Sequence, residues 1–153
     1  MRSLTRSVTR SVTRSLTTAI ATAVATGLLT GCMLLARAPQ DLDYSRTRTS
    51  EAGRYRVTIH PPGDTIPQGK LHRWTLHVET AAGTPVDSGT FVVDGGMPQH
   101  GHGLPTKPRV TRALGSGDHL VEGMKFNMGG WWVVKLRVDA GAGRDSVVFN
   151  VKL

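Results

Sequence analysis

Hydrophobic and polar residues alternate along much of the chain between residue 54 and Leu153. Tyr55, Val57 and Ile59 are separated by polar residues, and the same period of two recurs around Trp74. A period of two is typical of a β-strand with one buried face, because successive side chains point to opposite sides. The pattern predicts strands at residues 54–59, 73–79, 90–93, 109–114, 119–128, 131–138 and 147–153.

Turn residues separate these segments, as at Pro61–Gly63, Gly115–Gly117 and Asp139–Gly143. Short strands with turn signals about every 8–12 residues are typical of an antiparallel β-sandwich. No segment after residue 53 has a 3.6-residue apolar period, which argues against helices. We therefore predict an all-β fold, an antiparallel sandwich of about seven strands. A closed β-barrel fits the same periodicity.

The first 31 residues have the features of a secretion signal. Four arginines between positions 2 and 14 precede a mildly apolar stretch from Leu16 to Leu29. That stretch is too short for a membrane span, which needs about 20 apolar residues. It ends at Leu29-Thr30-Gly31-Cys32, which resembles a bacterial lipobox. In such signals the chain is cut before the cysteine, whose thiol is then lipidated. The sequence thus predicts a lipoprotein signal peptide at residues 1–31.

Cys32 is the only cysteine, so it has no disulfide partner within the chain, and lipidation accounts for its presence. Acyl chains would hold the protein at a membrane, since each buried methylene contributes about 0.8 kcal/mol. We expect a lipid-anchored, periplasm-facing protein of the bacterial cell envelope. Met33 after the cysteine favours the outer membrane, by resemblance to proteobacterial lipoproteins. Residues 32–53 are polar and predict a flexible tether to a domain at residues 54–153.

The charge balance gives no support for nucleic-acid binding. The formal net charge is +8, but four of the positive charges belong to the arginines of the signal peptide. The remainder of the chain has 15 basic and 11 acidic residues, without a run of basic residues interleaved with aromatics. Recognition of a phosphate backbone requires a concentrated basic surface. We therefore expect no nucleic-acid partner.

The segment Met97-Pro98-Gln99-His100-Gly101-His102-Gly103 holds the most distinctive chemistry. Thioether sulfur together with imidazole nitrogen is a ligand set that suits copper. The glycines at 95, 96, 101 and 103 predict a loop. His100 and His102 are two positions apart, so both rings leave an extended backbone on the same side. One ion at about 2.0 Å from a nitrogen of each ring is then feasible, with Met97 as a weaker ligand.

A further ligand must come from elsewhere in the chain. Met124 and Met128 share strand parity with Phe126, but an extended strand separates the two sulfurs by roughly 13 Å. Met128 borders Gly129-Gly130 at the end of the predicted strand, so we predict Met128 as the ligand and Met124 as a core residue. Such a Met/Phe stripe is also typical of an ordinary buried face. Of the adjacent Trp131 and Trp132, one should fill the core while the other covers the rim near the loops.

Two segments, Met97–Thr111 and Leu120–Trp132, together resemble the YtkA-like family, also labelled FixH-like. The resemblance extends from about Gly53 to Leu153. It implies a small immunoglobulin-like β-sandwich in a secreted or membrane-anchored bacterial protein, in some members linked with copper handling or oxidase maturation. A cuproprotein or an oxidase-maturation protein is the implied partner. Gly129 stands where family members often have proline, which loosens the turn after Met128. The resemblance implies no catalytic residue.

Two functions remain in view. The first is a copper-binding lipoprotein that stores or delivers the metal through Met97, His100, His102 and Met128. The second is a metal-free interaction module of the cell envelope, in which the tryptophan pair and the loop rim form a contact surface.

Other chemistry finds little support. Ser116, Asp118 and His119 are close in sequence, but a nucleophile elbow is lacking and triads do not assemble from sequence neighbours. A structural zinc site would need four firm nitrogen or sulfur ligands. We therefore expect no enzymatic activity. The remaining histidines predict surface or cross-strand packing positions: His60, His72, His77 and His119.

Overall fold

Nine strands and one 3₁₀ turn make up most of residues 38–153, the part of the chain that the computed structural model describes. The strands are β1 (Thr47–Thr49), β2 (Tyr55–His60), β3 (His72–Thr80), β4 (Thr90–Met97), β5 (His102–Gly103), β6 (Arg109–Gly115), β7 (Asp118–Met124), β8 (Trp131–Ala140) and β9 (Gly143–Lys152), and the turn is η1 (Pro98–His100). The predicted signal peptide and Cys32 lie outside the described residues. Within residues 38–153 no helix has the length and apolarity of a membrane span.

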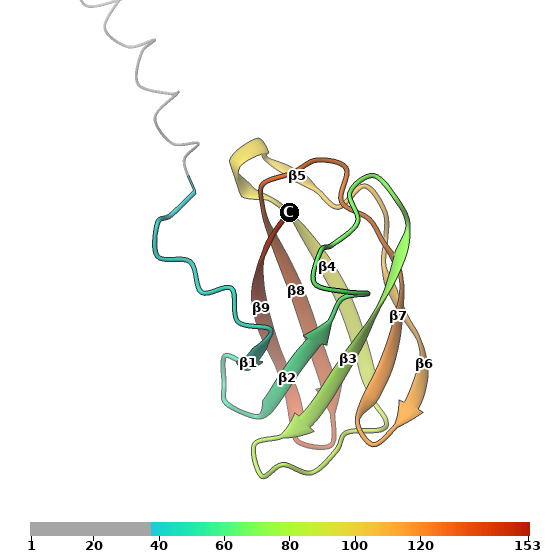
Figure 1. Cartoon of the computed structure of the whole chain (residues 1–153). Coiled ribbons are helices and arrows are strands. Elements are labelled where there is room, and N and C mark those ends of the chain that lie inside the picture. Colours follow the sequence, from blue (N-terminus) through green and yellow to red (C-terminus); the bar gives the residue numbers. More distant parts are fainter. Residues whose placement is uncertain (1–37) are drawn as a thin grey trace, which may run out of the picture. The chain divides into compact units, whose positions relative to one another are not determined.

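The strands form two antiparallel sheets that face each other (Figure 1). One sheet has the order β1-β2-β3-β7-β6, and the other has the order β5-β4-β8-β9. Inward-facing residues alternate with exposed ones along β2, β3, β8 and β9, so both sheets contribute to one apolar core. The predicted β-sandwich is confirmed, and each of the seven predicted strands is present.

Two of the predicted strand ends were wrong, and the last strand begins at Gly143 rather than at residue 147. The strand expected to stop at Val93 continues as β4 to Met97, because Gly95 and Gly96 pair with Val134 and Val133 of β8. The strand expected to reach Met128 stops at Met124, where the last pairing with β3 is made. Both differences concern glycine or irregular backbone, where the side-chain pattern gives little information about pairing.

The folded domain begins earlier than residue 54, so the predicted tether was wrong over its last part. β1, at Thr47–Thr49, pairs with β2 and forms the edge of the larger sheet. Ser50 follows it and is buried. The sequence around β1 has no apolar alternation, so its position depends on polar contacts with a distant strand.

Asp145, near the start of β9, provides those contacts. Its carboxylate accepts hydrogen bonds from Ser50 Oγ at 2.6 Å and from the backbone N–H groups of Ala52, Arg54 and Ser146 at 2.8–3.2 Å. Burial acts to raise the pKa of Asp145, but the hydrogen bonds from Ser50 and the three backbone groups outweigh it and lower the pKa to about 2. One buried carboxylate therefore fastens the β1–β2 turn to β9.

Replacement of Asp145 by asparagine should lower the free energy of unfolding by about 2 kcal/mol at neutral pH, because charge-assisted hydrogen bonds are lost and an amide N–H faces backbone donors. The folded-state pKa is depressed, so the contribution of Asp145 is present above its ordinary pKa of 3.8 and is lost as the pH falls toward about 2. Denaturant titrations at pH 7 and at several values between about pH 4 and pH 2 measure this.

The exposed Asp64→Asn serves as the matched control, with an expected change under about 0.5 kcal/mol. A difference between wild type and Asp145→Asn that stays constant down to pH 2 would contradict this account of the buried carboxylate.

Candidate metal centre

The Met97–Gly103 segment lies at the end of the sandwich where β4 finishes (Figure 1). Met97 is the last residue of β4, η1 reverses the chain, and β5 returns along the edge of β4. Gly101 has a φ of 65° and its N–H donates to Met97 O at 3.0 Å, which closes the turn. The predicted loop is therefore confined to residues 98–101, and the flanking residues belong to strands.

The pairing of β4 with β5 places Met97 directly opposite His102. Opposite residues of an antiparallel pair project to the same face, with Cβ atoms about 5 Å apart. Gly96 makes this close approach possible, because a Cβ atom there would lie 2.6 Å from His102 O. The hairpin thus brings a thioether and an imidazole together through backbone pairing rather than through loop flexibility.

The two imidazole rings of the segment lie next to each other. The ring centroids of His100 and His102 are 5.9 Å apart, and the ring planes differ by 29°. Two imidazoles that share one ion, with nitrogen–metal distances of about 2.0 Å, have centroids within roughly 6 Å of each other. His102 Nδ1 lies 3.1 Å from Gly103 O. A carbonyl oxygen only accepts hydrogen bonds, so in the neutral ring Nδ1 carries the proton and the lone pair of Nε2 is available to a metal ion.

Met97 is more buried than the predicted loop position implied, with 2% of its surface exposed. Its methyl group packs on the backbone of Gly130, where a Cβ atom would lie 2.6 Å from Met97 Cε. The glycine that follows Met128 by two residues therefore makes room for the side chain of Met97. Sulfur and imidazole meet at the boundary between the core and the exposed rim.

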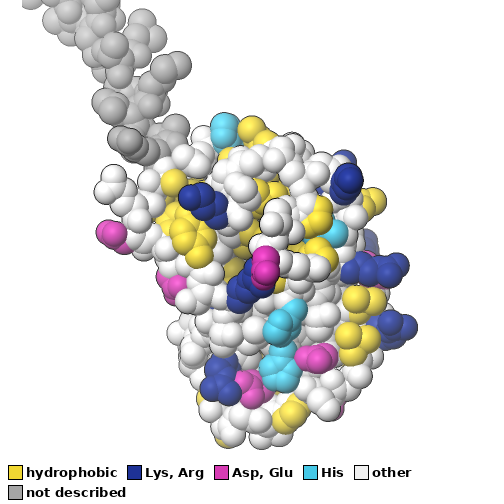
Figure 2. All heavy atoms as spheres, in the orientation of Figure 1, with side chains coloured by type: hydrophobic (Ala, Val, Ile, Leu, Met, Phe, Trp, Pro, Cys, Tyr) yellow, Lys and Arg dark blue, Asp and Glu magenta, His cyan; other side chains and the backbone are white. Residues whose placement is uncertain are grey.

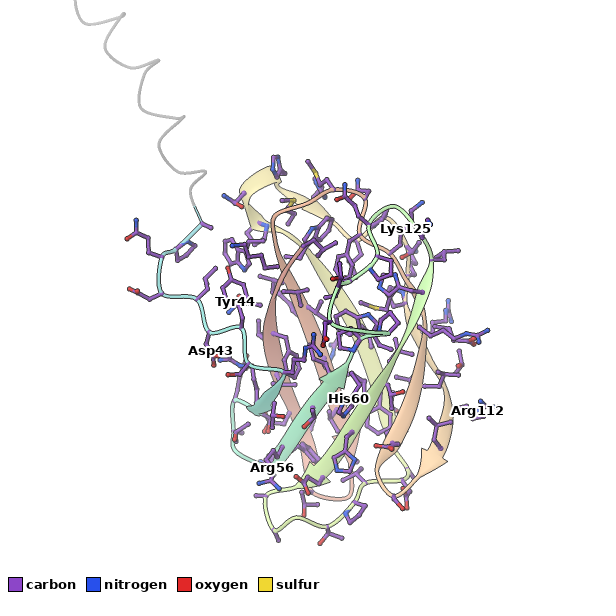
Figure 3. The ribbon with its side chains drawn as sticks, viewed as in Figure 1. Asp43, Tyr44, Arg56, His60, Arg112 and Lys125 are labelled. Atoms are coloured by element: carbon purple, nitrogen blue, oxygen red, sulfur yellow. The ribbon has the colours of Figure 1, made fainter. Side chains whose placement is uncertain are left out.

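Met128 is half-buried on the turn between β7 and β8, packed against the core. Its carbonyl accepts a hydrogen bond from Trp132 Nε1 at 3.0 Å. The chain leaves the strand after Met124, so the two methionines do not share one continuous strand as predicted. Met124 is fully buried, as predicted for a core residue. The sulfur atoms in Figure 3 lie in the half of the sandwich that carries η1.

For the tryptophan pair, the prediction that one indole fills the core is confirmed, but the prediction that the other covers the rim is wrong. Trp132 is fully buried and fills the core. Trp131 is half-buried and its Nε1 donates to Asn150 Oδ1 of β9 at 3.0 Å. The ring that reaches the rim is Trp132, because its centroid lies 5.4 Å from that of His102 in an edge-on contact.

Metal ligands other than methionine are sparse at this site. Residues 38–153 contain no group of three or more His, Cys, Asp or Glu side chains that could hold an ion. A metal centre in this part of the chain therefore depends on thioether sulfur in addition to imidazole nitrogen. Figure 2 shows imidazole and apolar side chains next to each other at the tip of this end of the molecule.

A protein-family model described as YtkA-like matches residues 49–137, more than half of the chain. The chain belongs to the YtkA-like family. The match begins at the end of β1 and ends within β8, so it includes the Met97–Gly103 segment and the turn that carries Met128. No curated protein and no solved structure matches the chain significantly.

The acidic and histidine residues considered for hydrolysis are separated in this YtkA-like domain. Asp118 Oδ1 lies 2.8 Å from His77 Nδ1 in a cross-strand hydrogen bond. His119 points into the core, where its Nε2 lies 2.7 Å from Val86 O. Consecutive strand residues face opposite sides, so Asp118 and His119 do not form a dyad with each other.

Sequence reasoning missed a chain of ring contacts beneath the rim of the YtkA-like domain. Trp132 contacts both His102 and Phe126, with ring centroids 5.4 and 5.2 Å away. Phe126 in turn lies 5.8 Å from His72 and 5.9 Å from Trp74. These residues come from four separate segments, so only the fold brings them together.

Substitution of Gly96 by alanine should displace β5 from β4, because the added Cβ meets backbone rather than a flexible side chain. We expect a loss of about 1–3 kcal/mol in the free energy of unfolding. Amide exchange should accelerate at Leu104 and Gly101, whose N–H groups donate to Gly95 O and Met97 O. Hydrogen exchange followed by NMR measures both sites.

Gly63→Ala is the control, since no atom lies within 4 Å of the Cβ position at Gly63. Unchanged protection of Leu104 in Gly96→Ala would mean that the hairpin tolerates a side chain at this position.

Proposed function

We propose that this YtkA-like protein is a lipid-anchored, periplasm-facing protein of the bacterial cell envelope that binds copper for storage or delivery. The ligands are Met97, His100, His102 and Met128. The observation that supports this proposal most is the backbone pairing of Met97 with His102, with the His100 ring 5.9 Å from the His102 ring.

The donor set favours copper over harder ions. Imidazole and thioether are neutral ligands, and thioether sulfur selects Cu(I) rather than Mg²⁺ or Ca²⁺. The hydrogen bond from His102 Nδ1 to Gly103 O orients the ring and increases the basicity of Nε2. Trp132 and Met97 form an apolar floor below the rings, which limits the access of water to a soft ion.

The placement of the ligands suits transfer to another protein. His100 is exposed on η1, while Met97 is buried beneath it. An acceptor can therefore replace the exposed ligand first and take the ion by stepwise exchange. The partner that we propose is a cuproprotein or an oxidase-maturation protein of the cell envelope.

Membership in the YtkA-like family fits a secreted or envelope protein domain. The lipid anchor at Cys32 belongs to our proposal and is based on the lipobox-like sequence Leu29–Cys32. Fourteen residues separate Cys32 from Thr47, where the first strand of the folded domain begins. An anchored Cys32 would thus keep the domain within a short reach of the bilayer surface.

A second candidate function, a protein-interaction module, is favoured by a groove between β4 and β6. The groove is lined by Val92, Lys107, Arg109 and Arg137, among others, and Val92 is 42% exposed. An apolar floor with cationic sides suits an acidic segment of a partner. The surface predicted for this function was different, since Trp132 is fully buried and unavailable for contact.

The double variant His100→Ala/His102→Ala should lose copper binding by at least 100-fold while the fold is retained, because both nitrogen ligands are removed from exposed or rim positions. Elemental analysis of protein isolated from a copper-supplied periplasm, followed by titration of the metal-free protein, measures this. Wild type without copper near stoichiometry would overturn the proposal.

The control for that variant is His60→Ala/His77→Ala, which also removes two imidazoles. His60 lies on the exposed face of β2 (Figure 3), and His77 pairs with Asp118 on the outer side of β3. Copper content should be unchanged in this control. Retained acidic-partner binding in a copper-free His100→Ala/His102→Ala variant would favour the interaction module instead.

Cys32→Ser should move the protein from the membrane fraction to the soluble periplasmic fraction, because the acyl chains can no longer be attached. Fractionation and mass spectrometry of the N-terminal peptide measure both effects. Thr30→Ser, which keeps a small residue before the cleavage point, is expected to leave lipidation unchanged. Membrane association of Cys32→Ser equal to wild type would exclude the lipid anchor.

A further inference from the structure

Two buried polar atoms at the start of β3 have no hydrogen-bond partner among the residues that the structure describes. They are His72 Nε2 and Trp74 Nε1. Buried polar atoms in folded proteins are nearly always paired, because an unpaired one costs about 1–3 kcal/mol. The indole N–H of Trp74 only donates hydrogen bonds, so His72 Nε2 is the one of these two atoms that can bind a metal ion.

The tautomer of the neutral His72 ring follows from the contact that Nδ1 makes. Nδ1 lies 3.1 Å from Lys70 O, and a carbonyl oxygen only accepts hydrogen bonds. Nδ1 therefore carries the proton in the neutral ring, and the buried Nε2 presents a lone pair. The same arrangement occurs in His102, where a backbone carbonyl also accepts a hydrogen bond from Nδ1 and the lone pair of Nε2 is left to coordinate a metal ion.

The side chains that pair or stack with His72 from the core are soft and uncharged. His72 is paired directly with Met124, which is fully buried on the same face of the sheet. The ring of Phe126 is 5.8 Å from the His72 ring, and the ring of Trp74 is 6.3 Å from it. On the core side, the neighbours of the His72 ring are thus a thioether and two aromatic rings.

We propose that His72 Nε2 and Met124 Sδ form a second metal site, which takes Cu(I). Imidazole with thioether selects a soft ion. Neutral ligands in a core favour a monovalent ion, because burial of a second charge without a carboxylate or thiolate is costly. The route to His72 is the open surface pocket that it lines with Leu71 and Gly123, whose wall also carries the Arg73–Glu122 ion pair.

This interior site is separate from the Met97–His102 segment. Phe126 and Trp132 lie between the two, since Phe126 contacts His72 and Trp132 contacts His102. The proposal does not require the function proposed above, and each site has its own ligands. The two sites are therefore distinguishable by substitution.

The test is an anaerobic titration of the full chain with Cu(I), in competition with a chromophoric Cu(I) chelator. Wild type should bind two equivalents. His100→Ala/His102→Ala should retain one equivalent, and addition of His72→Gln or Met124→Leu to that variant should weaken the remaining equivalent at least 10-fold. His60→Gln is the control and should change nothing. Quenching of tryptophan fluorescence by the retained ion should disappear with His72→Gln.

Each outcome decides the question. If His100→Ala/His102→Ala binds no Cu(I), or if its remaining ion is unaffected by both His72→Gln and Met124→Leu, the interior site does not exist. If His72→Gln removes the only ion that wild type binds, the rim site fails while the interior site stands.

X-ray absorption of the Cu(I)-loaded His100→Ala/His102→Ala variant provides a test that depends on no further substitution. It should show one imidazole nitrogen and one thioether sulfur. A spectrum without sulfur would overturn the assignment of Met124, even if the variants at His72 and Met124 failed to fold.

Discussion

The burial of Trp132 is the interaction on which the functional end of this sandwich depends. The indole is fully enclosed, and its one polar atom is satisfied by the carbonyl of Met128 at 3.0 Å. Its ring contacts Phe126 on one side and His102 on another. A single side chain therefore positions the turn before β8, the end of the larger sheet and the β4–β5 hairpin. The candidate ligands are held by packing against this ring, which explains how short segments rich in glycine keep a defined geometry.

The seven main strands could be predicted because the alternation of buried and exposed residues is a local property, as in β9 from Asp145 to Val151. The two short strands could not. β1 has no alternation of its own. It is positioned by Asp145, which is distant from it in the sequence. β5 and the end of β4 contain Gly95, Gly96 and Gly103, and glycine indicates a turn when the sequence is considered alone. Here Gly96 instead allows two backbones to approach closely.

Among the candidate ligands, some could also be predicted from the sequence and others could not. Met97, His100 and His102 are close in sequence, so their joint occurrence was visible. The structure adds the pairing of Met97 with His102 and the contact between the two imidazole rings. His72 carried no such signal, because a single histidine at the start of a strand is ordinary. What distinguishes it is the register of β3 with β7, which sets it opposite Met124, together with a hydrogen bond that fixes its tautomer. Periodicity gives the face of a strand but not the residue across from it, and so this pairing was beyond prediction.

The two sets of ligands differ in how they are linked to folding. Met97, His100 and His102 remain neighbours when the chain is unfolded, so an ion bound there stabilises the native state only by the difference between its affinities for the two states. His72 and Met124 are distant in sequence and meet only through the β3–β7 pairing. An ion held by them binds the native state alone, and it stabilises that state by an amount that grows with the ratio of the free ion concentration to Kd.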